Sequence, residues 1–148
     1  GSLVCDFATP KTTRMPRTMI TPHMGACPNE AEENCAAMAV SQMKDYLESG
    51  IIRNSVNYPD CDLGPVTSGL RIAALHDNVP NMIGQITAVL ARYDANIRRM
   101  SNEAQDGSAY TLIDLDGRLD DGAVADLRPI PGIYRIRVLE PPRKATRA

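Results

Sequence analysis

Two histidines, His23 and His76, are the residues of this 148-residue sequence best suited to acid–base chemistry. Imidazole titrates near neutral pH, so a histidine on a rigid loop can take a proton from a substrate hydroxyl. His23 lies between a predicted strand and a predicted helix, and no neighbouring carboxylate in the sequence orients it. From the residues alone, His23 is either a general acid/base or a loop histidine bonded to a backbone carbonyl, and the second interpretation is the simpler one.

His76 ends a predicted strand and is followed by Asn78 and by a helix start at Pro80. Free amides at a helix start favour a carboxylate, and an imidazole and a carboxamide can hydrogen-bond polar groups nearby. This combination would suit a free amino acid. A turn in which Asp77 and Asn78 cap the helix explains the same residues equally well. Asn96, which opens a later strand, is uninformative by itself.

The composition excludes several classes of function. The 16 Lys and Arg residues are balanced by 18 Asp and Glu residues, so the chain has no basic field for nucleic acid. No apolar run reaches the roughly 18 residues of a membrane span, and no signal peptide opens the chain, which favours a cytoplasmic protein. Cys5, Cys27, Cys35 and Cys61 lack metal-ligand spacing, so we expect reduced thiols and no metal site.

The N-terminal part contains one clear element, a helix at 29–49 with a mostly apolar face. Asn29 is a candidate N-cap, although Pro28 could instead be the first helical residue, and Gly50 suits the left-handed position that ends a helix. Residues 1–22 are irregular apart from a short strand at 3–7. The Pro- and Gly-rich residues 58–69 read as a linker between two units.

The second unit has the pattern β-α-β-β-α-β. The sequence predicts strands at 70–76, 95–103, 108–114 and 133–139, and helices at 80–93 and 119–128. Two right-handed crossovers would place a four-stranded antiparallel sheet on one side and both helices on the other, which is a ferredoxin-like α+β fold. Such a unit leaves one sheet face and the sheet edges uncovered, and side-by-side dimerisation would hide them. The basic tail at 141–148 is expected to be flexible.

Motifs along the chain resemble those of D-3-phosphoglycerate dehydrogenases. Residues 20–31, ITPHMGACPNEA, and 54–59, NSVNYP, are similar to the T-P-H-[ILM]-G-G/A-S-T-x-E-A segment and the S-V-N-[FY]-P exit that close the catalytic part of these enzymes. Residues 71–80, the pair at 96–97 and residues 130–139 match R-x-x-x-x-H-x-N-x-P, N-I and I-P-G-x-x-R-x-R-x-L of the family's C-terminal ACT domain. The resemblance covers nearly the whole chain in the right order.

The resemblance implies a C-terminal piece of an enzyme of L-serine biosynthesis. Residues 1–57 would be the remnant of the nucleotide-binding and substrate domains, 58–69 the linker, and 70–140 the ACT regulatory domain. His23 would take the proton from the C2 hydroxyl of 3-phosphoglycerate while a hydride passes to NAD. The sequence has no G-x-G-x-x-G turn to hold NAD, so we expect this cofactor in the full-length parent and no catalysis by the chain alone.

In the regulatory domain, the resemblance implies L-serine as an effector bound between two ACT units. His76 and Asn78 match the family's serine-binding loop, and Asn96 matches the Asn donated by the partner subunit. The family loop usually reads N-x-P-G, whereas Asn81 stands at the fourth position here. We expect a homodimer through the first strand and helix of this domain, and a tetramer of the parent stays open.

Two other functions fit the same residues. The ACT domain could be a structural assembly module that has lost its ligand. The replacement of the usual glycine by Asn81 leaves this alternative open. The parent could also be a dehydrogenase for another 2-hydroxy acid, because the residues that select the substrate lie upstream in the family.

Overall fold

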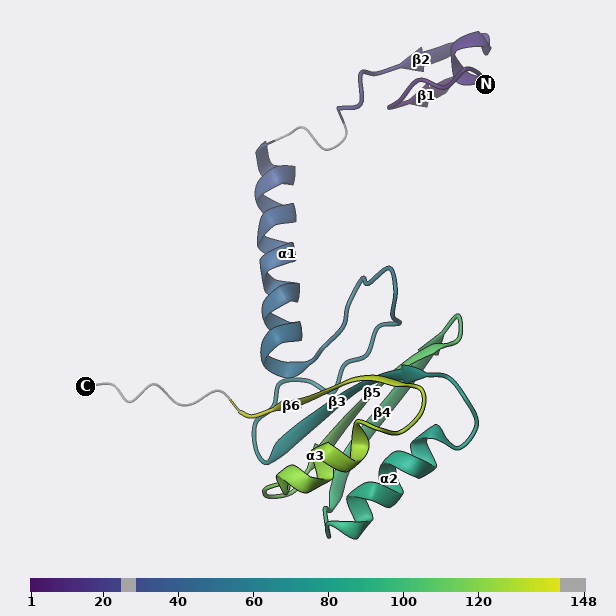
Figure 1. Ribbon diagram of the computed structural model, residues 1–148. Helices are drawn as coiled ribbons and strands as arrows, with labels where there is room; N and C mark the ends of the chain where they lie inside the picture. The colour runs from purple at the N-terminus through teal and green to yellow at the C-terminus, as the bar shows by residue number, and fades with distance from the viewer. Residues whose placement is uncertain (25–28, 142–148) are drawn as a thin grey trace, which may run out of the picture. The chain divides into compact units, whose positions relative to one another are not determined.

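The computed structural model describes residues 1–24 and 29–141, and the chain divides into two units, Gly1–Ser41 and Gln42–Ala148 (Figure 1). This division falls inside the long helix α1 (Asn29–Ser49), whereas the sequence suggested a boundary after residue 57. Residues 25–28, which include the suggested helix start at Pro28, and the expected flexible tail at 142–148 lie outside the described residues. No helix in the described ranges is both long and apolar enough to span a membrane.

The N-terminal unit holds a small parallel sheet. Strand β1 (Leu3–Cys5) pairs with β2 (Thr18–Ile20), and a short 3-10 helix, η1 (Thr12–Arg14), lies between them. The expected strand at 3–7 therefore ends at Cys5, and β2 was not predicted, since three residues are too few to show a period. Helix α1 then begins at Asn29 and ends before Gly50, whose φ of +69° is the left-handed conformation predicted for it.

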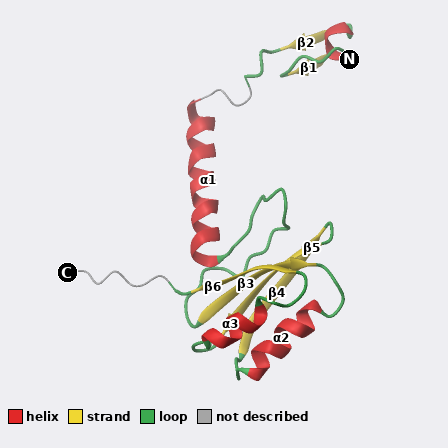
Figure 2. Cartoon of the chain, viewed as in Figure 1, coloured by secondary structure: helices red, strands yellow, loops and turns green. Residues whose placement is uncertain are grey.

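The C-terminal unit has the predicted ferredoxin-like α+β fold. Its elements are β3 (Leu70–Asp77), α2 (Met82–Arg92), β4 (Ile97–Gln105), β5 (Ser108–Leu115), α3 (Asp121–Leu127) and β6 (Ile133–Leu139). The sheet order is β4-β5-β3-β6, every neighbouring pair is antiparallel, and both helices cover the same face (Figures 1 and 2). Asp106 and Gly107 join β4 to β5 with positive φ at both residues, as a two-residue hairpin turn requires.

Aliphatic side chains fill the space between this sheet and its helices. The core contains ten buried residues: Ile72, Ala74, Met82, Ile86, Val89, Leu90, Ile113, Leu115, Leu127 and Ile136. They come from β3, β5 and β6 on one side and from α2 and α3 on the other. Burial of this apolar surface is what holds the two helices on the sheet.

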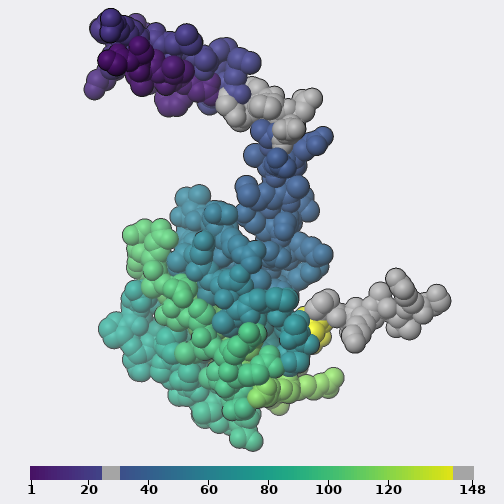
Figure 3. Space-filling view, turned by 180° about the vertical axis from the view of Figure 1, so that it is seen from behind, coloured from purple at the N-terminus to yellow at the C-terminus, as the bar shows by residue number. Residues whose placement is uncertain are grey.

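The opposite face of the sheet is covered, which corrects the expectation that it is left bare. Ile52, Cys61 and Val66 pack against Tyr110 and Leu112 in a second buried cluster. The backbones of Ile52 and Cys61 exchange two 3.0 Å hydrogen bonds, so part of the segment expected as a linker is tied down. Figure 3, seen from behind, shows this blue-to-teal segment on the surface of the unit. Its few apolar residues follow no period, so sequence patterning could not reveal this packing.

Two arginines hold the last turn of α1 on this face of the sheet. Arg71 is fully buried and donates to the carbonyl oxygens of Ser49 (2.8 Å) and Gly64 (2.7 Å). Arg137 donates to the carbonyls of Tyr46 (3.1 Å) and Leu47 (3.0 Å). The last carbonyls of a helix lack N–H donors further along the helix, and cations there are favoured by the helix dipole.

The sheet order also decides which strands can meet another chain. β3 pairs with β5 on one side and β6 on the other, so dimerisation through this first strand, as expected from sequence, cannot occur by strand pairing. The outer strands are β4 and β6. Any side-by-side pairing of two copies has to use one of these two edges.

Candidate functional site

His23 is exposed on the loop between β2 and α1, with a φ of +58°. Asp6 braces this loop on both sides of the histidine. Its Oδ1 accepts hydrogen bonds from the Thr21 hydroxyl (2.5 Å) and from the Met24 backbone N–H (2.8 Å). The parallel pairing of β1 with β2 brings Asp6 to this loop, so no sequence spacing could have connected it with His23. An exposed imidazole on a braced loop can exchange a proton with a bound hydroxyl.

His76 is 1% exposed at the end of β3, and both of its ring nitrogens are bonded. Nδ1 lies 2.8 Å from the carbonyl oxygen of Asp77, and Nε2 lies 2.7 Å from Thr111 Oγ1. Thr111 is also fully buried and donates to Asn102 Oδ1 at 2.7 Å. Sequence reasoning identified His76 but missed Thr111 and Asn102, because these two residues lie on β5 and β4, far from His76 in the sequence.

Asn78 is exposed and follows directly on the buried histidine. Its backbone N–H donates to the carbonyl of Gly107 (2.8 Å), which joins this loop to the β4–β5 hairpin. Within the described residues its carboxamide has no hydrogen-bond partner, and neither do the backbone N–H groups of Ile83 and Gly84 at the start of α2. Donors for a small anionic group are therefore present beside Asn78.

Asn81 takes the place of the usual glycine and keeps the glycine-like backbone, with a φ of +65°. Asn tolerates the left-handed region better than most residues. A Cβ added at Gly84 would lie 2.2 Å from Asn81 Oδ1, so the Asn81 side chain lies over Gly84. The glycine displaced by three positions thus makes room for the carboxamide at the helix start.

Asn96 lies at the other end of the sheet from His76 and Asn78. Ile97 and Leu70 both pair with Leu115, whereas Asp77 pairs with Ser108 beside the hairpin turn. Asn96 Nδ2 donates to Asp116 Oδ2 at 2.8 Å, and its backbone carbonyl accepts from the Asp116 N–H at 3.0 Å. One copy of the chain therefore brings His76 and Asn78 together and keeps Asn96 away from them.

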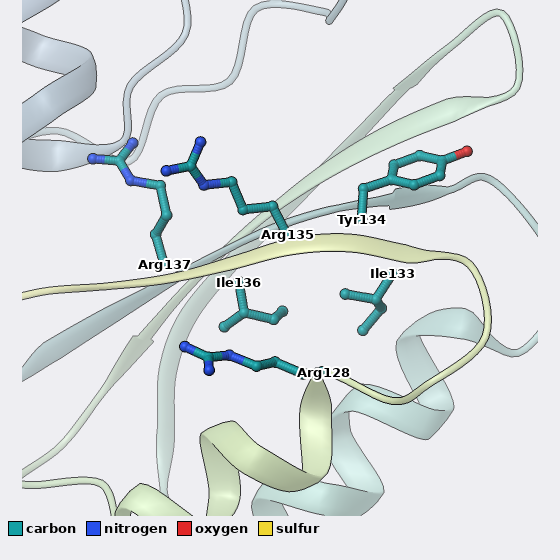
Figure 4. Close-up of a pocket in the computed structure, with 6 residues that line it drawn as sticks. All are labelled: Arg128, Ile133, Tyr134, Arg135, Ile136 and Arg137. Atoms are coloured by element: carbon teal, nitrogen blue, oxygen red, sulfur yellow. The ribbon is translucent and has the colours of Figure 1, made fainter.

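A hollow of about 430 Å³ lies elsewhere, along the outer strand β6 (Figure 4). Arg135 and Arg137 extend from one side of the strand, and Arg128 lies beside Ile136 on the other side. These guanidinium groups do not converge on one point, so the hollow is no concentrated anion site. Tyr134, at its end, donates to the Asp77 carboxylate. Among the described residues, no group of three His, Cys, Asp or Glu side chains could hold a metal ion.

The chain is similar to D-3-phosphoglycerate dehydrogenases over most of its length. The enzyme of Escherichia coli K12 is 28% identical over 123 residues, which are 82% of this chain and 30% of that protein. The enzyme of Dictyostelium discoideum is 27% identical over 126 residues, 85% of this chain and 30% of that protein. Enzyme 1 of Saccharomyces cerevisiae is 23% identical over 123 residues. These similarities confirm the resemblance, and the chain spans less than a third of the length of these relatives.

No protein-family model matches the chain. Among solved structures, the ACT domain of a GTP pyrophosphokinase from Chlorobium tepidum is 26% identical with a TM-score of 0.42, over 49% of this chain and 100% of that one. A formyltetrahydrofolate deformylase from Pseudomonas putida has a TM-score of 0.43 at 14% identity, over 49% of this chain and 28% of that one. Since these scores are low, the ferredoxin-like fold is assigned from the strand order and helix placement described above.

Proposed function

We propose that this chain is the C-terminal regulatory part of a D-3-phosphoglycerate dehydrogenase of L-serine biosynthesis, and that two copies bind L-serine between their ACT domains. The similarity to these enzymes over four-fifths of the chain supports the parent activity. The observation that carries the regulatory part is the placement of Asn78 and Asn96 at opposite ends of one sheet. A two-fold pair of sheets would bring each of them to the other.

The edge strand β4 is the better candidate for this pairing. If two β4 strands pair antiparallel about Ser101, each Arg99 lies opposite the partner subunit's Glu103, and opposite charges across strands are stabilising. The same pairing of two β6 strands about Ile136 would place Arg135 opposite the partner subunit's Arg137. Like charges directly opposite each other repel, so charge selects β4.

Pairing about Ser101 also completes the candidate site. Asn96 lies as far before Ser101 as Asp106 lies after it, so the partner subunit's Asn96 would face the Asp106-Gly107 turn. Residues 78–81, between β3 and α2, form the effector loop. The turn is bonded to this loop, because the Asn78 N–H donates to the Gly107 carbonyl. Each dimer would hold two sites, each bordered by Asn78 of one copy and the Asn96 of the partner subunit.

The groups around this site suit an α-amino acid. Its carboxylate can accept from the N–H groups of Ile83 and Gly84 and from Asn78. The partner subunit's Asn96 uses its Nδ2 on Asp116, which leaves Oδ1 to accept from an ammonium or a hydroxyl group. His76 is buried and both of its ring nitrogens are bonded within the chain, so we assign it to positioning the loop and not to contacting the ligand.

Asn81 favours a second candidate, an ACT domain that ties subunits together without a ligand. Its carboxamide lies over Gly84, close to the amides that would hold a ligand carboxylate. If it closes this approach, the β4 edge would still pair and L-serine would not bind.

For the N-terminal unit, we propose that His23 is the general acid/base of the parent enzyme, with Asp6 keeping its loop in place. The described part of the chain offers no Gly-rich turn for a dinucleotide pyrophosphate, so no residue here is assigned to NAD and the isolated chain should be inactive. Replacing His23 with Ala in the full-length enzyme should reduce turnover by roughly 10²–10⁴-fold.

Complementation between two variants tests the shared site. Asn78→Ala and Asn96→Ala should each weaken L-serine binding about tenfold or more in calorimetry, whereas Asp77→Ala, whose side chain bonds Tyr134, serves as a matched control. In a mixed dimer of the two variants, one site has lost both asparagines and the other has kept both. Mixing equal amounts should therefore restore normal affinity at about a quarter of the sites. No restoration would rule out the shared site, and a dimer that binds no L-serine at all would favour the second candidate.

A further inference from the structure

We propose that Thr111 and Asn102 are positioning residues of the effector loop, acting through a hydrogen-bond chain from His76 to the edge strand β4. The inference rests on the proposed function, since it concerns the site where L-serine would bind. It adds two residues that do not border that site and that no motif in the sequence singled out. Their role follows from contacts across three strands of the sheet.

The chain of contacts runs sideways across the sheet. His76 is on β3, Thr111 on β5 and Asn102 on β4, and the two links are 2.7 Å each. The Thr111 hydroxyl gives its one proton to Asn102 Oδ1, so its lone pairs accept from His76 Nε2–H. The His76 Nδ1–H donates to the Asp77 carbonyl, which can only accept. The three side chains are thereby held in one line from the centre of the sheet to its edge.

Small residues make this line possible. His76 pairs with Ala109 across the strands, and Thr111 pairs with Ala74, and both alanines are fully buried. An alanine opposite each polar residue leaves room for the ring and the hydroxyl to meet diagonally. Larger side chains at these two positions would separate them.

Burial makes each link depend on the other. His76 is 1% exposed and Thr111 is 0% exposed, so water does not replace a lost partner, and an unsatisfied buried polar group is strongly disfavoured. The other end of His76 is bonded to the Asp77 carbonyl, at the start of the loop that carries Asn78. Loss of the Thr111 hydroxyl would therefore free the His76 ring and remove one of the contacts that position the loop, while the Asn78 N–H stays bonded to Gly107.

The line ends on the surface that the proposed dimer uses. Asn102 is exposed on β4, one residue from Ser101, about which two copies would pair. The position of the Asn102 carboxamide and the position of the effector loop are then set by the same contacts. We infer that pairing of the β4 edges and binding at the effector loop assist each other.

Three threonine variants test the positioning role. Thr111→Val keeps the shape and removes the hydroxyl, and it should weaken L-serine binding about tenfold, whereas Thr111→Ser should restore it to within about threefold. Thr87→Val is the matched control, since the Thr87 hydroxyl bonds carbonyls of its own helix. Normal binding by Thr111→Val, or failure of Thr111→Ser to restore it, would overturn the inference.

The exposed residue Asn102 provides a variant that should fold normally. Asn102→Ala should weaken both L-serine binding and self-association in sedimentation, and the double variant with Thr111→Val should be no worse than Thr111→Val alone. Fully additive losses would show that the two residues act separately.

A ligand-free readout separates this inference from the proposed function. The nitrogen chemical shifts of the His76 ring should change in Thr111→Val and Asn102→Ala and stay unchanged in Thr87→Val. If the wild-type chain binds no L-serine, the proposed function fails while these shifts still decide whether the hydrogen-bond chain exists. Unchanged shifts in both variants would overturn the chain itself.

Discussion

Arg71 on β3 and Asp114 on β5 are direct cross-strand partners and form a buried, two-pronged ion pair under the segment that follows α1. The Nε–Oδ1 and Nη2–Oδ2 distances are 2.6 and 3.0 Å, and neither side chain is more than 2% exposed. Arg99 on β4 also donates to Asp114 from a half-exposed position. Arg71 is the first residue of the R-x-x-x-x-H-x-N-x-P motif. Its contacts with Asp114, Ser49 and Gly64 give it a structural role in holding the covering segment on the sheet, and not a role in binding the effector.

Arg71→Met should lower the free energy of unfolding by about 3–5 kcal/mol, because it removes the buried partner of the Asp114 carboxylate and the donor to the carbonyls of Ser49 and Gly64. Urea unfolding followed by circular dichroism measures this loss. Arg99→Ala removes the half-exposed partner of the same carboxylate and should cost about 1 kcal/mol or less. Equal losses in the two variants would contradict the assignment of the buried pair as the main support.

Stability should fall in acid through Asp114. Burial acts to raise the pKa of this carboxyl, but the hydrogen bonds from Arg71 and Arg99 outweigh it and hold the pKa below its usual value. A carboxylate whose pKa is lowered by folding stabilises the protein above its unfolded pKa, and this stability is lost as the pH falls through the folded pKa. Urea midpoints should therefore decrease below about pH 4. Asp114→Asn should be less stable throughout and show a flatter dependence in this range.

Asn81 and Gly84 should behave as a coupled pair. Gly84→Ala places a Cβ against Asn81 Oδ1 and should destabilise the chain, although alanine is the better helix former. In an Asn81→Gly background the clash is absent, so the same substitution should become neutral or stabilising by up to about 1 kcal/mol. Thermal unfolding of the four variants measures this reversal of sign, and equal effects of Gly84→Ala in both backgrounds would contradict it.

Asn81→Gly also bears on the ligand. It restores the glycine usual for the family and uncovers the start of α2, so it should tighten L-serine binding several-fold if the carboxamide restricts access. Calorimetry on the same variants reports the affinity. A weaker affinity after the substitution would indicate that Asn81 is itself a ligand contact.

Hydrogen exchange should differ along α1. The carbonyls of Tyr46, Leu47 and Ser49 are held by arginines of the sheet, whereas residues 32–40 are exposed along their length. Amides at 46–52 should therefore exchange at least tenfold more slowly than those at 32–40. Arg137→Met should reduce this difference and leave β5 protected, because Arg71 still holds the Ser49 carbonyl. Uniform protection of the whole helix in the unsubstituted chain would contradict the assignment.

The sequence predicted the elements of residues 70–139 well because their apolar residues are strongly periodic and the Asp106-Gly107 turn is specific. It missed the cover on the second sheet face, since Ile52, Cys61 and Val66 are isolated apolar residues in a Pro- and Gly-rich stretch. Of the candidate site, the motif residues could be named, but their partners Thr111, Asn102 and Asp6 come from distant segments. Such contacts depend on strand order and register, which residue spacing does not report.

The two outer strands differ in what they allow an assembly to become. A sheet whose two edges were equally adhesive could add copies without limit and grow into a ribbon or fibre. Here, self-pairing at β4 would leave each end of the joined sheet closed by β6, where Arg135 and Arg137 oppose the approach of an identical strand. Under the proposed pairing, growth would stop after two copies, and the arginines of β6 would limit the assembly to a discrete particle.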